Sequence, residues 1–172
     1  MKRIKLFVFA LLLGSTVFSY AQSPYSMGVG AAVGNVFGPS FKVFVTDNFA
    51  ISADLSVRVC PTIYEGVSLT TFSLDLNPNF MYESSITNNL YWLAGGGVTL
   101  GYIFGITAYG DMMIGDSGRF GINAIGGIEY KFDIPLSIQA DVRPGYGLLF
   151  NSGPGVANGF DWAAVATIRY TF

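Results

Sequence analysis

The chain has 172 residues, of which 12% are charged and 16% are aromatic, and its mean hydropathy is +0.47. Charged residues make up about 25% of a typical soluble domain, so this composition is too apolar for an ordinary soluble surface. The formal net charge of −2 also argues against a nucleic-acid partner, because phosphate binding requires clustered Lys and Arg.

The first 21 residues have the pattern of a secretory signal peptide. Three basic residues within the first five positions precede a short apolar run at 6–13, and Ser19 and Ala21 are the small residues of a cleavage site. A retained N-terminal anchor is the alternative. Cleavage would leave residues 22–172 as one domain with a net charge of −5, since the leader holds three of the nine basic and none of the eleven acidic residues.

Apolar and polar residues alternate along the rest of the chain. No apolar run reaches the ~20 residues of a membrane-spanning helix, whereas a period of two indicates β-strands with one apolar and one polar face. Short turns are expected at 46–48, 84–89 and 133–135, and connections that are mostly longer at 35–39, 60–66, 105–118 and 151–159. We expect eight strands, at 26–34, 40–46, 49–59, 67–83, 90–104, 119–132, 136–150 and 160–172.

Two prolines interrupt these predicted strands. Pro78 and Pro144 cannot donate a hydrogen bond to a neighbouring strand. A bulge or local break is therefore expected at each of them.

Charge is confined to one face of the predicted strands. All six basic residues after position 21 are on the polar face, and the acidic residues are there or in connections. A Lys or Arg facing lipid at mid-membrane would cost ~2–4 kcal/mol, so a bilayer would impose this exclusion. A soluble sandwich or lipocalin would need a charge-rich exposed face, which two lysines do not supply. We therefore expect an all-β fold, an eight-stranded antiparallel up-and-down transmembrane β-barrel.

The chain ends in Tyr170-Thr171-Phe172, with Ile168 two positions earlier. With the export signal and the eight alternating segments, this ending resembles the small eight-stranded outer-membrane β-barrels of Gram-negative bacteria, the OmpX-like and OmpA-transmembrane-domain-like group, over residues 25–172. The resemblance implies an outer-membrane location, contact with lipid and lipopolysaccharide, and recognition of Ile168, Tyr170 and Phe172 by the barrel-insertion machinery. It implies no single activity, because such proteins serve as anchors, adhesins, narrow pores or lipid-modifying enzymes.

The polar face predicts a lumen filled with ion pairs. An eight-stranded barrel is only just wide enough to be filled by its own side chains, and unpaired buried charge is costly. Close pairs are expected within strands, Asp54 with Arg58 and Glu129 with Lys131 among them. A narrow channel, or a transporter with a lateral opening near Pro78 or Pro144, is the alternative. The predicted ionic network is Lys42, Asp54, Arg58, Asp75, Glu129, Lys131, Asp141, Arg143 and Arg169.

Catalytic motifs are missing from the sequence. The chain has no His, which excludes Ser-His-Asp triads and His-metal sites. Cys60 is the only cysteine, so no internal disulfide can form, and we interpret it as a packed residue. We expect no catalytic residue, metal or cofactor, and keep a lipid-modifying enzyme as the alternative.

Two predicted outer connections, 60–66 and 105–118, carry apolar residues that could meet an extracellular partner. Tyr64, Tyr109, Met112 and Met113 would form an adaptable contact surface. The alternative is that the 105–118 connection folds back as a lid over the barrel mouth.

Overall fold

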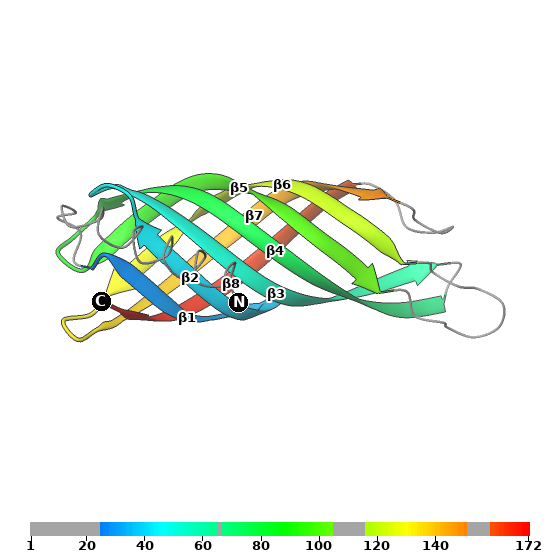
Figure 1. Ribbon diagram of the computed structural model, residues 1–172, viewed down its shortest axis with the longest axis horizontal. Coiled ribbons are helices and arrows are strands. Elements are labelled where there is room, and N and C mark those ends of the chain that lie inside the picture. Colours follow the sequence, from blue (N-terminus) through cyan, green and yellow to red (C-terminus); the bar gives the residue numbers. More distant parts are fainter. Residues whose placement is uncertain (1–24, 65–66, 105–115, 151–158) are drawn as a thin grey trace, which may run out of the picture.

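The computed structural model describes residues 25–64, 67–104, 116–150 and 159–172. They form a closed antiparallel barrel in which neighbouring strands follow chain order and the last strand pairs with the first (Figure 1). The predicted eight-stranded up-and-down barrel is confirmed, and the predicted signal peptide lies outside the described residues. The strands are β1 (Met27–Gly34), β2 (Val36–Phe44), β3 (Phe49–Tyr64), β4 (Val67–Ser85), β5 (Leu90–Phe104), β6 (Ser117–Lys131), β7 (Leu136–Phe150) and β8 (Gly159–Thr171).

The strand registers set the tilt of the barrel. A path from Gly28 through paired residues of successive strands reaches Asp161 on β8, and the register between β8 and β1 places that residue ten positions beyond Gly28 along the direction of β1. With strands ~4.8 Å apart and a rise of ~3.3 Å per residue, this offset corresponds to a tilt of about 40°. The path runs through Lys42, Ser52, Asn79, Gly97, Asn123, Gly145 and Asp161.

The two ends of the barrel differ. One end, here called the turn end, carries the three short turns at 45–48, 86–89 and 132–135 together with the C-terminus (Figure 1). The opposite, loop end carries the other connections. Two predicted connections are wrong: β2 already begins at Val36, so 35–39 is not a loop, and β3 continues to Tyr64, so 60–66 is mostly strand.

The prolines lie within continuous strands. Pro39, Pro78 and Pro144 pair with Ala31, Ala53 and Trp162 respectively. On the other side of each proline, the recorded pairs skip two residues and resume in the same register. The register shows no bulge at Pro78 or Pro144, whereas the expected local break in pairing is confirmed at both. Because proline has no N–H, each of these strands loses its backbone pairing with only one of its two neighbouring strands at that point. The proline side chains face outward, so the lost pairing leaves the lumen unchanged.

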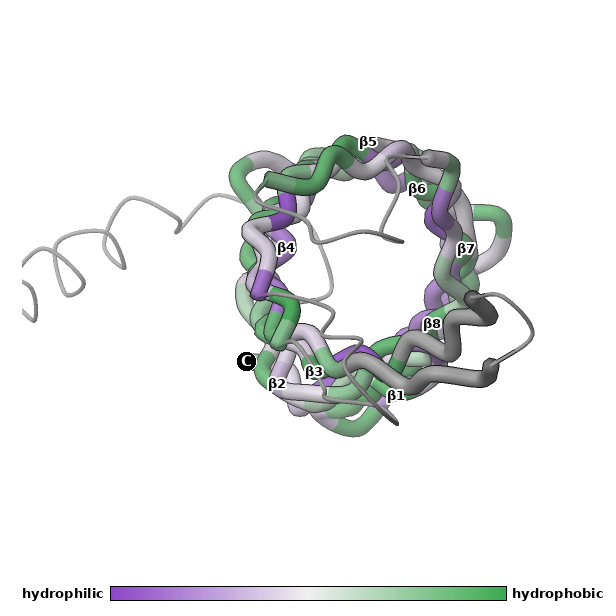
Figure 2. Tube along the Cα trace, turned by 90° about the vertical axis from the view of Figure 1, so that its right-hand side faces the viewer, coloured by the Kyte–Doolittle hydropathy of each residue, from purple (hydrophilic) through white to green (hydrophobic). Residues whose placement is uncertain are grey.

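Polarity is inverted relative to a soluble protein. Among the described residues, 22 buried residues are polar or charged and 11 are apolar, while 36 large apolar side chains are exposed. Purple and green positions alternate along the tube in Figure 2, which views the barrel along its axis. Within the described ranges, no helix has the length and apolar character needed to cross a membrane. The apolar outer face requires an apolar surrounding.

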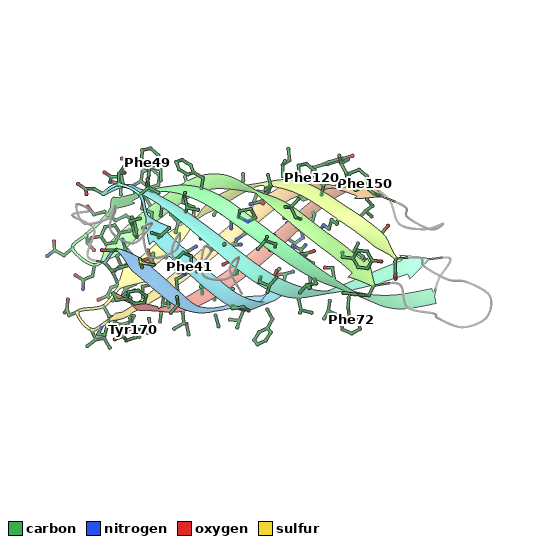
Figure 3. The ribbon with its side chains drawn as sticks, in the orientation of Figure 1. Phe41, Phe49, Phe72, Phe120, Phe150 and Tyr170 are labelled. Atoms are coloured by element: carbon green, nitrogen blue, oxygen red, sulfur yellow. The ribbon has the colours of Figure 1, made fainter. Side chains whose placement is uncertain are left out.

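Aromatic residues form two belts on the outer face. On four strands, exposed aromatic residues stand ten positions apart, which corresponds to ~25 Å along the barrel axis at the tilt given above. Figure 3 shows Phe49 and Tyr170 toward the turn end and Phe72, Phe120 and Phe150 toward the loop end. A ~25 Å apolar band between aromatic girdles is typical of transmembrane barrels. The pairs are Phe72 and Tyr82, Trp92 and Tyr102, Phe120 and Tyr130, and Phe160 and Tyr170.

Candidate functional site

The polar lumen is the candidate site, and its turn-end half is centred on Glu129. The Glu129 carboxylate accepts hydrogen bonds from Lys42 Nζ at 2.7 Å and from the Tyr25 hydroxyl at 2.7 Å. Lys42 also forms an ion pair with Glu83, and Lys131 Nζ lies 3.3 Å from Glu83 Oε2. Both glutamates are almost completely buried. Each carboxylate is therefore paired with ammonium groups from other strands, as charge at this depth requires.

Aromatic rings close the turn end over this cluster. Tyr25 and Phe44 pack edge to face with ring centroids 5.1 Å apart, and both are buried. Lys131 Nζ lies 3.8 Å from the centre of the Tyr91 ring and 4.5 Å from that of Phe44. Cation–π contacts of this kind stabilise a desolvated ammonium. The lumen is therefore closed at this end by side chains that are held by the ion pairs beneath them.

Arg169, Gln139 and Arg143 connect the two halves of the lumen. Arg169 donates to Gln139 Oε1 at 2.7 Å, and Gln139 Nε2 donates to Asp141 Oδ2 at 2.6 Å. Arg143 binds Asp141 and Asp54, each at 2.6 Å. On the β1 side, a Cβ at Gly28 would lie 3.3 Å from Arg169 Cδ, so a larger residue there would crowd the arginine. Polar contacts therefore cross the lumen without interruption from Lys42 to Asp54.

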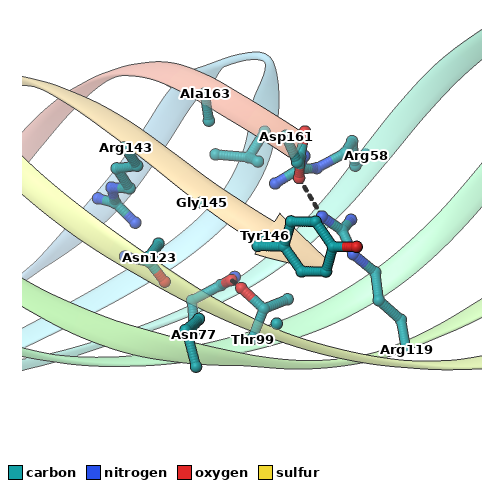
Figure 4. Close-up of a pocket in the computed structure, with 13 residues that line it drawn as sticks. Arg58, Asn77, Thr99, Arg119, Asn123, Arg143, Gly145, Tyr146, Asp161 and Ala163 are labelled. Atoms are coloured by element: carbon teal, nitrogen blue, oxygen red, sulfur yellow. Dashed lines mark hydrogen bonds and ion pairs between the residues drawn. The ribbon is translucent and has the colours of Figure 1, made fainter. Parts of the chain in front are cut away.

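The loop-end half contains Arg58, Arg119, Asp75 and Asp161. Arg58 Nη1 lies 2.5 Å from Asp161 Oδ2, and Arg119 forms ion pairs with both Asp161 and Asp75. Arg58, Arg119 and Asp161 line a cavity of about 20 Å³ (Figure 4), which has room for about one water molecule. The loop-end half is therefore also filled, and Asp161 is its most accessible charge, with 34% of its side chain exposed.

All nine residues of the predicted ionic network have inward-facing, buried side chains. The pairings differ in part from those expected. Arg143 does contact Asp141, and Lys131 lies 3.8 Å from Glu129. Asp54 instead pairs with Arg143, while Arg58 pairs with Asp161, because residues four apart on a strand are separated by ~13 Å.

Several contributors were not singled out from the sequence. The alternation places Glu83, Arg119 and Asp161 on the polar face without distinguishing them from their neighbours, and in the structure they complete the two clusters. Tyr25 precedes the first strand, where no alternation marks it, and Phe44 is an aromatic residue on the polar face of β2. An aromatic residue on a charged face is the one sequence signal that could have identified Phe44.

The contact surface predicted from Tyr64, Tyr109, Met112 and Met113 falls outside the part of the chain whose side chains the structure describes. Tyr109, Met112 and Met113 lie outside the described residues, as does the side chain of Tyr64.

Ile168, Tyr170 and Phe172 lie on the outer face at the turn end, where each is more than half exposed. Their recognition by the insertion machinery stays a prediction.

Comparisons with known proteins agree on the fold. No protein-family model and no curated protein matches the sequence. The crystal structure of Neisserial surface protein A (NspA) superposes with a TM-score of 0.56 over 85% of this chain and 93% of that chain. The chain has the fold of NspA. With 12% identical residues, the likeness to NspA is one of architecture.

The chemistry available in the lumen is that of paired charges. Among the described residues, no group of three or more Cys, Asp or Glu could share a metal ion. Glu83 and Glu129, the carboxylates of the turn-end half, each form ion pairs with both Lys42 and Lys131. Such an arrangement favours rigidity and a closed interior.

Proposed function

We propose that the protein is an integral outer-membrane β-barrel with a closed, salt-bridged lumen, and that it acts as a structural or surface-interaction protein without catalysis. It reaches the membrane after export on a cleaved signal peptide and inserts by the barrel-insertion machinery. Its direct partners are then outer-membrane lipid and lipopolysaccharide. The turn end faces the periplasm and the loop end faces outside, as short periplasmic turns and longer outer loops require.

The observation that carries this proposal is the combination of an apolar outer face and a filled polar interior. The cavity of about 20 Å³ beside Asp161 has room for about one water molecule, which supports a closed interior. The ion pairs around Glu129 and Arg143 cross the lumen at two levels. Both features support a wall or scaffold rather than a pore, and the loops at the outer end supply the contact surface.

Two measurements test the proposal. The protein from purified outer membranes should migrate faster on a denaturing gel before boiling than after boiling, because a folded barrel resists the detergent. In planar bilayers it should conduct no current above leak. A protein recovered in the aqueous phase would contradict the membrane location. Discrete conductance that changes on replacing Arg143 or Arg58 would instead establish the channel alternative.

Unchanged lipid A on deletion of the gene, measured by mass spectrometry, is the expected result for a non-catalytic barrel. Altered acylation would favour the lipid-modifying alternative. A binding partner at the outer end would be lost on exchanging residues 105–115 for a glycine-serine linker, with gel migration unchanged.

A further inference from the structure

A groove runs along the outer wall of the barrel over β6, β7 and β8, which lie side by side (Figure 1). Its part nearer the turn end has a volume of about 610 Å³ and is lined in part by Gly126, Ala140 and Ala164. Its part nearer the loop end has a volume of about 500 Å³ and reaches Tyr146 and Phe160. The two parts adjoin, because they occupy successive outward positions of β6 and of β7. We call them together the outer groove.

The outer groove exists because the residues that face outward here are small. Ala140 pairs with Ala166. At the next outward position along β7, Val142 pairs with Ala164 on one side and with Gly126 on the other. A Cβ added at Gly126 would meet no atom within 4 Å. The wall is therefore recessed where larger side chains would have filled the space.

The groove has a closed end and an end at the membrane interface. Toward the turn end it stops short of the next outward pair, Ile138 with Ile168, which lines neither part. Toward the loop end it reaches the pair of Tyr146 and Phe160, at the level of the loop-end aromatic belt. From Ala140 to Tyr146 the strand rises about 15 Å along the barrel axis, which is half of the ~30 Å hydrocarbon core of a bilayer. The groove therefore begins at the outer interface and has the length of the chain region of one leaflet.

The lining of the groove calls for an apolar occupant. Asp141 is the charged residue at its larger part, and the buried carboxylate binds Arg143 inside the lumen at 2.6 Å. The other residues that line this part are Gly, Ala, Val and Ile. An apolar chain in the groove makes the dispersion contacts that an empty gap against the wall would forfeit.

A second copy of the barrel does not fit the outer groove. Two copies that pair symmetrically in one bilayer are related by a two-fold axis along the membrane normal, so the same patch of each copy meets at the same level. The recess of one barrel would then face the recess of the other, with the isoleucine and aromatic pairs in contact below and above. The void between them would lose the close packing that holds an interface together. A single hydrocarbon chain is narrow enough to follow the recess.

We infer that the outer groove is a docking site for one acyl chain of an outer-leaflet lipid. The chain enters at Tyr146 and Phe160, lies over Gly126 and Ala140, and ends above Ile138. The site recognises the chain and not the head group, because no charge faces the groove among its described lining residues. The inference rests on the proposed membrane-spanning function and adds a position and a lipid component to it.

Electron paramagnetic resonance of the barrel in phosphatidylcholine vesicles tests the inference. The probes are phosphatidylcholine and phosphatidylglycerol that carry a nitroxide near the end of one chain. The parent should hold about one more motionally restricted chain per barrel than Gly126→Leu with Ala140→Leu, because the added side chains fill the groove. Ala53→Leu is the matched control, since Ala53 faces outward on β3 and pairs with Pro78 between the belts. The control should match the parent, and the two head groups should give the same number.

A second variant, Ala164→Leu with Ala166→Leu, fills the groove from β8 and replaces the first if that one shows no folded band on gels. Equal numbers of restricted chains in the parent and the filled variants would overturn the inference, as would a preference of about twofold or more for one head group. Crosslinked dimers of the parent that disappear in the filled variants would also overturn it, because a second copy would then cover the groove. If the parent shows no restricted lipid at all, the proposed function itself fails, and the inference with it.

Discussion

Replacing Glu129 with Gln should destabilise the barrel by about 3–5 kcal/mol, the cost of leaving a buried charge without its partner. The Glu129 carboxylate accepts hydrogen bonds from Lys42 and Tyr25, each at 2.7 Å, and lies 3.9 Å from Arg169. The substitution keeps the size of the side chain and removes its charge. Among the described residues, Glu83 would then be the one carboxylate paired with Lys42 and Lys131.

Urea titration of the barrel in phospholipid vesicles, with folded and unfolded fractions separated by gel migration, gives the free energy of unfolding. Ser137→Ala is the matched control, because the buried Ser137 hydroxyl has no hydrogen-bond partner in the described structure, and its loss should cost less than ~1 kcal/mol. Adding Lys131→Met to Glu129→Gln removes one uncompensated cation. The double variant should be ~1–3 kcal/mol more stable than the sum of the two single-variant losses would predict. A Glu129→Gln cost below ~1 kcal/mol, or strict additivity, would refute the ion-pair account of the lumen.

Three further outcomes are expected. Leu76 lies between the aromatic belts at Phe72 and Tyr82, so Leu76→Lys should lower the free energy of unfolding by ~2–4 kcal/mol in the same titration. Ile86 lies in a turn, where the same change to Lys should lower it by only ~0–1 kcal/mol. Equal losses for the two variants would contradict the assigned bilayer position. Asp161→Asn should keep the hydrogen bond from the Trp162 N–H to its side-chain oxygen and lose the ion pairs with Arg58 and Arg119. Its free energy of unfolding should therefore lie between those of the parent and of Asp161→Ala, which loses both interactions. Phe172→Ala should lower the folded fraction on gels of outer membranes without changing the urea midpoint of the protein that does insert.

Alternation predicted the two faces of the barrel well because apolar residues stay on the outer face and charged residues stay inside along each described strand. Each predicted lumen charge, from Lys42 on β2 to Arg169 on β8, is buried inside the barrel. A period of two determines the side of every residue once one is known. The fold class therefore followed from local pattern and composition together.

The sequence predicts that the second strand begins at residue 40, because residues typical of turns precede it, whereas β2 begins at Val36. Gly38 and Pro39 indicate a turn, yet alternation continues through them, with Val36 and Ser40 buried and Phe37 exposed. Partners across the lumen could not be predicted either. Arg143 reaches Asp54 from β7, and such a contact depends on the register of the whole barrel rather than on neighbours in the sequence.

The last strand carries both Arg169 and Asp161, and it also closes the ring by pairing with β1. Until β8 pairs, Gln139 lacks the guanidinium that links it to the turn-end half, and Arg58 and Arg119 lack Asp161, one of the two carboxylates that they share. Sealing the ring and neutralising the interior are thus a single event. A barrel in which β8 has not yet paired with β1 would keep a wet, charged seam, which would oppose its release into the proposed bilayer before the ring is sealed.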